Sequence, residues 1–181
     1  VALGERMEIL DLTHDLGLPV FAASRYHADG RFCAIGFGCH ADPLIALERA
    51  VSEMAQRWNM EQDDDFGASI DRLSTSGADY LLPDGTAKPR AADDFPFTRR
   101  DDLRADIENL TARFQAKGLE MLVVDLTRPD IQLPVMRVMV PGMVHWWPRF
   151  GCRRLYEAPR ALGWITVDVR EEDLNPVPCP W

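Results

Sequence analysis

Apolar positions along the chain group into short runs separated by turn-forming residues, a pattern typical of β-strands. Five such runs predict strands, at residues 8–12, 19–26, 31–37, 119–126 and 134–140. Asp29 and Gly30 form a dipeptide that favours a tight hairpin turn, so the second and third runs are expected to pair. The first three strands should therefore form an antiparallel meander.

Two longer segments have helical spacing instead. The first is expected from Pro43 to about Trp58, and Asp42 is placed to cap its first amides. Its apolar stripe consists of Leu44, Leu47, Val51, Met54 and Trp58. Its polar side consists of Arg49, Glu53 and Gln56. The second helix begins near Asp101 and ends at Gly118. The expected buried face of this helix consists of Leu103, Ile107, Leu110 and Phe114.

The sequence repeats one unit near its start and again near its end. Residues 9–20 and 123–135 share the order Asp-Leu-Thr, a turn, and Pro-Val, with one residue inserted in the second copy. Asp11 and Asp125 take the same place in the two copies, so we expect both to cap the turn rather than act in catalysis. The chain is therefore expected to be an α+β protein with a mostly antiparallel sheet, packed helices and this internal duplication.

Composition excludes several classes of function. At 181 residues the chain suits one globular domain, and its net charge of −9 argues against a nucleic-acid partner. No run reaches the ~18 apolar residues of a membrane span, and the first residues do not show the basic-then-apolar pattern of a secretion signal. Four cysteines without C-x-x-C spacing favour reduced thiols in the cytoplasm. The chain begins at Val1 rather than methionine, which is compatible with a piece cut from a longer protein.

Two segments lack a regular period. Residues 59–98 predict an exposed, irregular insertion. Residues 174–181 form a tail in which prolines alternate with other residues before the terminal Trp181. Alternating prolines favour a stiff, extended chain, which could hold the terminal carboxylate in place as a general base. A loose end or a partner-docking peptide is the alternative.

Candidate chemistry concentrates on the first helix. Arg49, Glu53 and Gln56 are neighbours on one face, and a carboxylate beside an amide and a guanidinium could bind Mg²⁺ and phosphate. The alternative is a solvated polar face with an exposed Arg49–Glu53 ion pair. Gly36-x-Gly38 could cradle a phosphate or simply free the turn. Arg137 interrupts an apolar strand, so it either faces solvent or pairs with an anion.

Taken together, these segments resemble the second half of YcaO-family domains. The resemblance rests on residues 36–43, 46–56, 125–135 and 137–142 and on the closing Pro-x-Pro-x-Pro, which recur in family order. It implies that residues 1–181 are the C-terminal part of such a domain. The upstream Ser-x-x-x-Glu-x-x-Glu-Arg pattern of the family is absent here. The chain is thus expected to be a fragment, one part of a two-chain enzyme, or a degenerate protein, and to form a homo-oligomer.

The resemblance also implies an activity. YcaO domains use ATP and Mg²⁺ to phosphorylate a peptide amide oxygen, and azoline-forming members cyclodehydrate Cys, Ser or Thr in ribosomal peptide precursors. Azoline formation is the first expectation because of the tail. Thioamidation with a TfuA-like partner protein is the second, and a leader-peptide-binding partner is also compatible with the family. A non-catalytic binding or scaffold module is the competing hypothesis.

The family's site residues can be placed by position. Glu53 resembles its Mg²⁺-coordinating carboxylate, and Gln56 falls beside the next metal and nucleotide contact. Three arginines are candidate nucleotide contacts: Arg49, Arg57 and Arg137. The tail resembles one that places a C-terminal carboxylate in the active site, which implicates four residues: Pro176, Pro178, Pro180 and Trp181.

Overall fold

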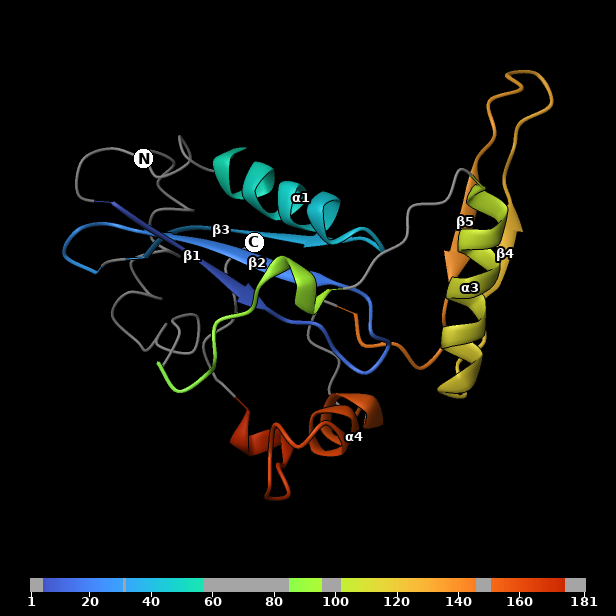
Figure 1. Cartoon of the computed structure of the whole chain (residues 1–181). Coiled ribbons are helices and arrows are strands. Elements are labelled where there is room, and N and C mark those ends of the chain that lie inside the picture. The colour runs from blue at the N-terminus through green and yellow to red at the C-terminus, as the bar shows by residue number, and fades with distance from the viewer. Residues whose placement is uncertain (1–4, 31, 57–84, 96–101, 146–150, 175–181) are drawn as a thin grey trace. The chain divides into compact units, whose positions relative to one another are not determined.

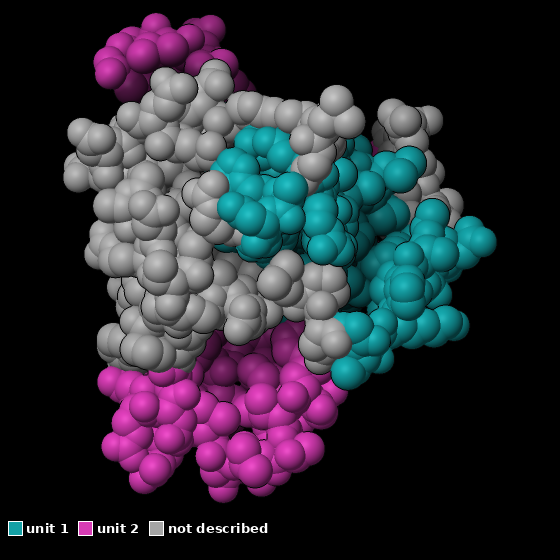
Figure 2. Space-filling view, turned by 90° about the vertical axis from the view of Figure 1, so that its left-hand side faces the viewer, with its two compact units in different colours: residues 1–99, 175–181 teal, residues 100–174 magenta. Residues whose placement is uncertain are grey.

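The computed structural model describes most of the chain as two compact units. One unit comprises residues 1–99 and 175–181, and the other comprises residues 100–174 (Figure 2). The described residues are 5–30, 32–56, 85–95, 102–145 and 151–174. No helix in these described ranges is both long and apolar enough to cross a membrane.

The first unit is built on an antiparallel meander with the strand order β1-β2-β3. Its strands are β1 (Arg6–Asp11), β2 (Val20–Tyr26) and β3 (Phe32–Cys39). Helix α1 (Pro43–Gln56) runs along one face of this sheet (Figure 1). A short 3₁₀ turn, η3 (Ala92–Asp94), lies in the segment expected to be an irregular insertion. The meander and the first helix are therefore confirmed.

Helix α1 packs on the sheet through small residues rather than through the apolar stripe expected from the sequence. Its buried residues are Ala46, Ala50 and Met54, whereas Leu44 is 67% exposed. Leu47 and Val51 are only partly buried against this core, and Trp58 lies outside the described residues. The expected stripe was therefore wrong in part, because the helix sits so close to the strands that alanines fill the contact.

The duplication is visible in individual hydrogen bonds. In the first copy, the N–H of Thr13 donates to Asp11 Oδ1 at 2.9 Å, and the N–H of Val20 donates to Thr13 Oγ1 at 3.3 Å. The second copy repeats both bonds at 2.8 and 3.1 Å, from the N–H of Thr127 to Asp125 and from the N–H of Val135 to Thr127. The expected capping role of the two aspartates is thus confirmed.

The second unit contains the second hairpin and two helices. Its elements are α3 (Leu103–Ala116), β4 (Leu122–Asp125), β5 (Met136–Met139), α4 (Arg153–Ala161) and the 3₁₀ turn η4 (Glu171–Asp173). Strands β4 and β5 pair antiparallel. Together with the first unit, they confirm an α+β fold with antiparallel sheets.

One expectation for the second unit needs correction, and one helix was not expected. Of the face expected to be buried on α3, Phe114 is 8% exposed, but Leu103 is 79% and Ile107 is 59% exposed. In the described part of this unit, the apolar face of α3 is therefore covered at Phe114 and exposed at Leu103 and Ile107. Helix α4 was not among the elements expected from the sequence, and Pro159 lies inside it. An i,i+4 ion pair from Arg153 to Glu157 was the available helical signal.

Candidate functional site

The polar side of α1 is tied to the backbone of β3. Glu53 Oε2 accepts a hydrogen bond of 2.6 Å from the N–H of Phe37, and the Glu53 side chain is half-buried. One turn earlier, Arg49 Nη1 donates to the carbonyl of Cys39 at 3.0 Å. Both side chains therefore reach the β3 backbone, Glu53 from a half-buried position and Arg49 from an exposed one.

The remaining candidates are distributed over the chain. Gln56 is exposed and is the last residue of α1. Arg137 is exposed on β5 in the second unit, where it pairs across from Val124. The structure thus brings Arg49 and Glu53 to one helix–strand boundary, with Gln56 one turn beyond. Five candidates lie outside the described residues: Arg57, Pro176, Pro178, Pro180 and Trp181.

The side chains around Glu53 that could ligate a metal ion limit which metal this part of the chain could bind. Within the described ranges, no three His, Cys, Asp or Glu side chains cluster closely enough to form a metal cage. A half-buried carboxylate with an amide three residues later instead fits Mg²⁺, which typically uses one or two protein carboxylates and takes its other ligands from phosphates and water. Among the described residues, the donors beside Glu53 are therefore too few for a metal site made of protein alone.

The two glycines of the Gly-x-Gly motif serve packing. Both lie inside β3, and a Cβ at Gly36 would collide with the backbone of Met54 and Ala50. A Cβ at Gly38 would collide with the carbonyl of Ala46. Because the helix backbone occupies the space in front of both glycines, close packing against α1 accounts for the motif, rather than the freedom of a turn. The sequence signal was the pairing of Gly-x-Gly with the spaced alanines of the helix.

The turn before α1 is held by side-chain caps. Asp42 Oδ1 accepts from the N–H of Leu44 at 2.9 Å, as expected of the N-cap. His40 Nδ1 accepts from the N–H of Asp42 at 2.9 Å, which gives this histidine a structural role.

Partial burial raises the pKa of the Cys39 thiol above its ordinary value, an effect that Arg49 opposes. At neutral pH Cys39 is therefore a thiol rather than a reactive thiolate.

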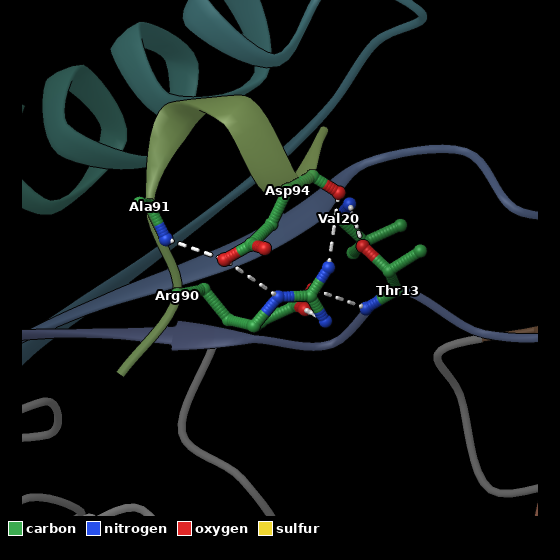
Figure 3. A network of polar contacts seen from close by, with 6 residues as sticks. Thr13, Val20, Arg90, Ala91 and Asp94 are labelled. Atoms are coloured by element: carbon green, nitrogen blue, oxygen red, sulfur yellow. Dashed lines mark hydrogen bonds and ion pairs between the residues drawn. The ribbon is translucent and has the colours of Figure 1, made fainter. Parts of the chain in front are cut away.

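An anchor that the sequence did not indicate lies in the segment 85–95. Arg90 Nη1 bonds Asp11 Oδ2 at 3.1 Å, and Arg90 Nη2 donates to the carbonyl of Asp94 at 3.1 Å (Figure 3). The guanidinium lies over the ring of Phe95, which meets Phe21 edge-to-face with centroids 5.1 Å apart. The segment was missed because its contacts join residues far apart in sequence.

Beside the segment 85–95, a cavity of about 1500 Å³ opens along β1.

Comparison with known proteins adds a family. A family model described as YcaO cyclodehydratase, ATP- and Mg²⁺-binding, matches residues 2–144. An uncharacterized protein from the region 3′ of tfuA in Rhizobium leguminosarum bv. trifolii is 32% identical over 160 residues, which cover 77% of this chain and 37% of that protein. An uncharacterized protein of Methanothermobacter thermautotrophicus is 29% identical over 160 residues, which cover 78% of this chain and 40% of that protein.

Solved structures show the same relationship. A heterocyclase in complex with substrate and cofactor is similar at a TM-score of 0.86 and 41% identity, over 98% of this chain and 25% of that one. The heterocyclase TruD is similar at a TM-score of 0.85 and 36% sequence identity, over 98% of this chain and 26% of that one. YcaO from Methanopyrus kandleri, bound with AMPPCP and Mg²⁺, is similar at a TM-score of 0.56 and 26% sequence identity, over 76% of this chain and 38% of that one. The chain therefore spans about two fifths of the curated relatives and a quarter of the heterocyclases.

Proposed function

Because the chain belongs to the YcaO family, for which ATP and Mg²⁺ are the cofactors, we propose that it forms part of an enzyme that activates peptide backbone amides. The reaction we favour is cyclodehydration, in which a Cys, Ser or Thr side chain closes on the preceding amide to give an azoline. The observation that supports this choice is the similarity to a heterocyclase at 41% identity over 98% of the chain. The enzyme would act on ribosomal peptide precursors in the cytoplasm, as a homo-oligomer.

In this proposal, the polar side of α1 binds the nucleotide. Glu53, held by the N–H of Phe37, and Gln56 would hold Mg²⁺. Arg49 would contact phosphate or sugar oxygens, together with Arg57 and Arg137. When bound, Mg-ATP supplies the phosphoryl group that turns the amide oxygen into a leaving group. The bond from Glu53 to β3 supports this role because a carboxylate fixed in advance binds a cation at lower entropic cost.

The C-terminal tail is proposed to supply the base. The carboxylate of Trp181 would remove the proton from the attacking side chain, and three prolines would stiffen the approach: Pro176, Pro178 and Pro180. The support for this role is the family resemblance of the tail, together with the low conformational entropy of alternating prolines. A leader-peptide-binding partner would present the precursor peptide.

Thioamidation is the second candidate. The observation that favours it is the relative from the tfuA region, which suggests a TfuA-like partner for this chain as well. Mass spectrometry of the modified peptide separates the two reactions, because an azoline forms with loss of water whereas a thioamide exchanges oxygen for sulfur. A scaffold module without catalysis predicts neither change.

Titration of the chain with Mg-ADP tests the nucleotide site, with Glu53→Gln as the decisive variant. An amide oxygen can still accept from the N–H of Phe37, so this variant keeps the helix–strand bond and removes only the charge. We expect Mg-ADP affinity to fall at least about tenfold, since a charge-assisted ligand is lost, with folding unchanged. Glu48→Gln, exposed on the same helix, is the control and should bind like the parent chain.

Two results would contradict the proposal. Equal Mg-ADP binding by the parent chain and Glu53→Gln would remove Glu53 from the metal site. A folded parent chain that does not bind Mg-ADP would favour the scaffold hypothesis for the chain by itself. Circular dichroism of each variant establishes that the fold is kept.

A further inference from the structure

The cavity beside β1 has the shape of a groove along a strand. It is lined by five consecutive residues, 8–12, with apolar side chains from α1 and the segment 85–95 on its other walls. Successive strand residues point to opposite faces, so five in a row can line one cavity only where it follows the edge of the strand. Five residues span about 17 Å. At about 1500 Å³ the groove also exceeds the ~300–1,000 Å³ of most small-molecule sites.

The strand register leaves backbone groups of β1 facing this groove. The N–H of Leu12 donates to the carbonyl of Val20 at 2.8 Å, which makes this a hydrogen-bonded pair. Along an antiparallel ladder, hydrogen-bonded pairs alternate with pairs that are not hydrogen-bonded. Ile9 and Asp11 therefore belong to the second kind, and their backbone N–H and C=O groups point away from β2. Among the described residues, no strand pairs with this outer edge of β1. The edge is therefore a template for one added strand.

The side-chain environment suits alternating apolar residues. Ile9 lies opposite Ala23 in the register, on the face of the sheet that packs against α1. The wall above it is formed by Leu44, which is 67% exposed, and by Leu47, which is partly buried. On that face, an added strand would place every second side chain on an apolar surface and leave the others outside.

Charge argues against a nucleotide in the groove. Four carboxylates line it and only two cations do: Glu8, Asp11, Asp42 and Asp93 against Lys88 and Arg90. One of those cations, Arg90, is already engaged by Asp11 and Asp94. A triphosphate would be repelled by this excess of negative charge, whereas a basic side chain at the end of a peptide would be attracted.

We propose that the outer edge of β1 binds an extended segment of the peptide substrate as an additional antiparallel or parallel strand, within the groove formed with α1 and residues 85–95. This inference rests on the proposed function for the identity of the peptide. It adds a substrate-binding surface that is separate from the Glu53 face. Main-chain hydrogen bonds to Ile9 and Asp11 supply affinity, and the apolar wall selects alternate side chains.

Fluorescence anisotropy on the full chain tests this surface. The probe is a short peptide in which valine and threonine alternate between two terminal lysines. We expect saturable binding, and a loss of about tenfold or more when the valine amides are N-methylated, because methylation removes the N–H groups that pair with the strand. Replacing the terminal lysines with glutamates should also weaken binding. The N-methylated peptide tests pairing on the unaltered protein, so the result does not depend on a variant that folds.

Two variants locate the binding edge. Ile9→Pro removes one outward N–H from an edge position, where proline is tolerated, and should weaken binding about tenfold. Val123→Pro is the matched control, because Val123 occupies the equivalent outward position of β4 and does not line this groove. It should leave peptide binding unchanged.

Three results would overturn the inference: equal affinity for the N-methylated peptide, equal loss in the two proline variants, or displacement of the peptide by Mg-ADP. A separate Mg-ADP titration distinguishes this failure from failure of the proposed function. Peptide pairing without nucleotide binding would contradict only the proposed function. Nucleotide binding without peptide pairing would contradict only the groove.

Discussion

At the scale of single residues, the two copies of the repeat satisfy the backbone amides of their turns with the same pair of side chains. Each uses an aspartate and a threonine to satisfy the amides that leave the strand. The turn also requires a residue with positive φ, which is Gly17 at 65° in the first copy and Gln132 at 58° in the second. A non-glycine residue rarely adopts this conformation, so the hydrogen bonds of the turn must offset the strain at Gln132.

The second copy predicts a measurable titration. Hydrogen bonds from the hydroxyl and N–H of Thr127 lower the pKa of Asp125 below its ordinary value of 3.8. A carboxyl with a depressed folded-state pKa stabilises the fold above its unfolded pKa, and that contribution is lost as pH falls through the folded value. We expect Thr127→Val to raise the pKa of Asp125 towards 3.8 in an NMR titration.

Thr127→Ser is the control for that titration, since it keeps the hydroxyl. Its Asp125 pKa should stay depressed. An Asp125 pKa unchanged in Thr127→Val would show that the threonine hydroxyl does not hold the carboxylate. Acidification should then lower the stability of the β4–β5 hairpin by the same amount in the parent chain and in the variant.

At the scale of elements, the approach of α1 to β3 determines the site. Glycines in the strand and alanines in the helix bring the two backbones together, and only at this separation can the short Glu53 side chain reach the N–H of Phe37. Packing and candidate chemistry are therefore coupled. A change that moves the helix outward should also displace the carboxylate.

Gly36→Ala tests this coupling. Its Cβ would meet the backbone of Met54 and Ala50, and it would lie 2.8 Å from the carbonyl carbon of Glu53. Backbone cannot move aside like a flexible side chain, so we expect a loss of about 3 kcal/mol in the free energy of unfolding by urea. Gly30→Ala is the control, because it has open space but a φ of 87°, and should cost about 1 kcal/mol. Equal losses would contradict a close helix–strand contact.

At the scale of the whole molecule, the two units differ in how much core they have. Most residues of β2 and β3 are buried in the first unit, and α1 packs on one face of these strands. In the described part of the second unit, the buried apolar side chains are Phe114 and Leu119, and every residue of β4 and β5 is exposed. An exposed apolar hairpin of this kind is typical of an interaction surface.

Hydrogen exchange should therefore differ between the two hairpins. With few buried contacts to hold it closed, the β4–β5 hairpin should open locally at low cost. We expect its amides to exchange at least about tenfold faster than those of β2 and β3, as measured by mass spectrometry on the isolated chain. Equal protection would contradict this and would indicate that a second copy or another partner covers the hairpin in solution.

The sequence by itself determined the features that depend on near neighbours. The duplicated turn and the Asp42 cap each join groups a few residues apart, so residue order is enough to predict them. The same holds for the antiparallel meander, in which consecutive strands are linked by short turns. The YcaO resemblance could also be recognised from residue order.

Only the tertiary structure decided which faces meet. Arg90 reaches Asp11 across 79 positions, and Glu53 reaches Phe37 across 16. It also decided that Ala46 and Ala50, rather than Leu44, form the buried face of α1. Local periodicity specifies which side of a helix is apolar, but the distance between two backbones depends on the side chains of both partners. Contacts that depend on this distance therefore cannot be predicted from the pattern of either segment alone.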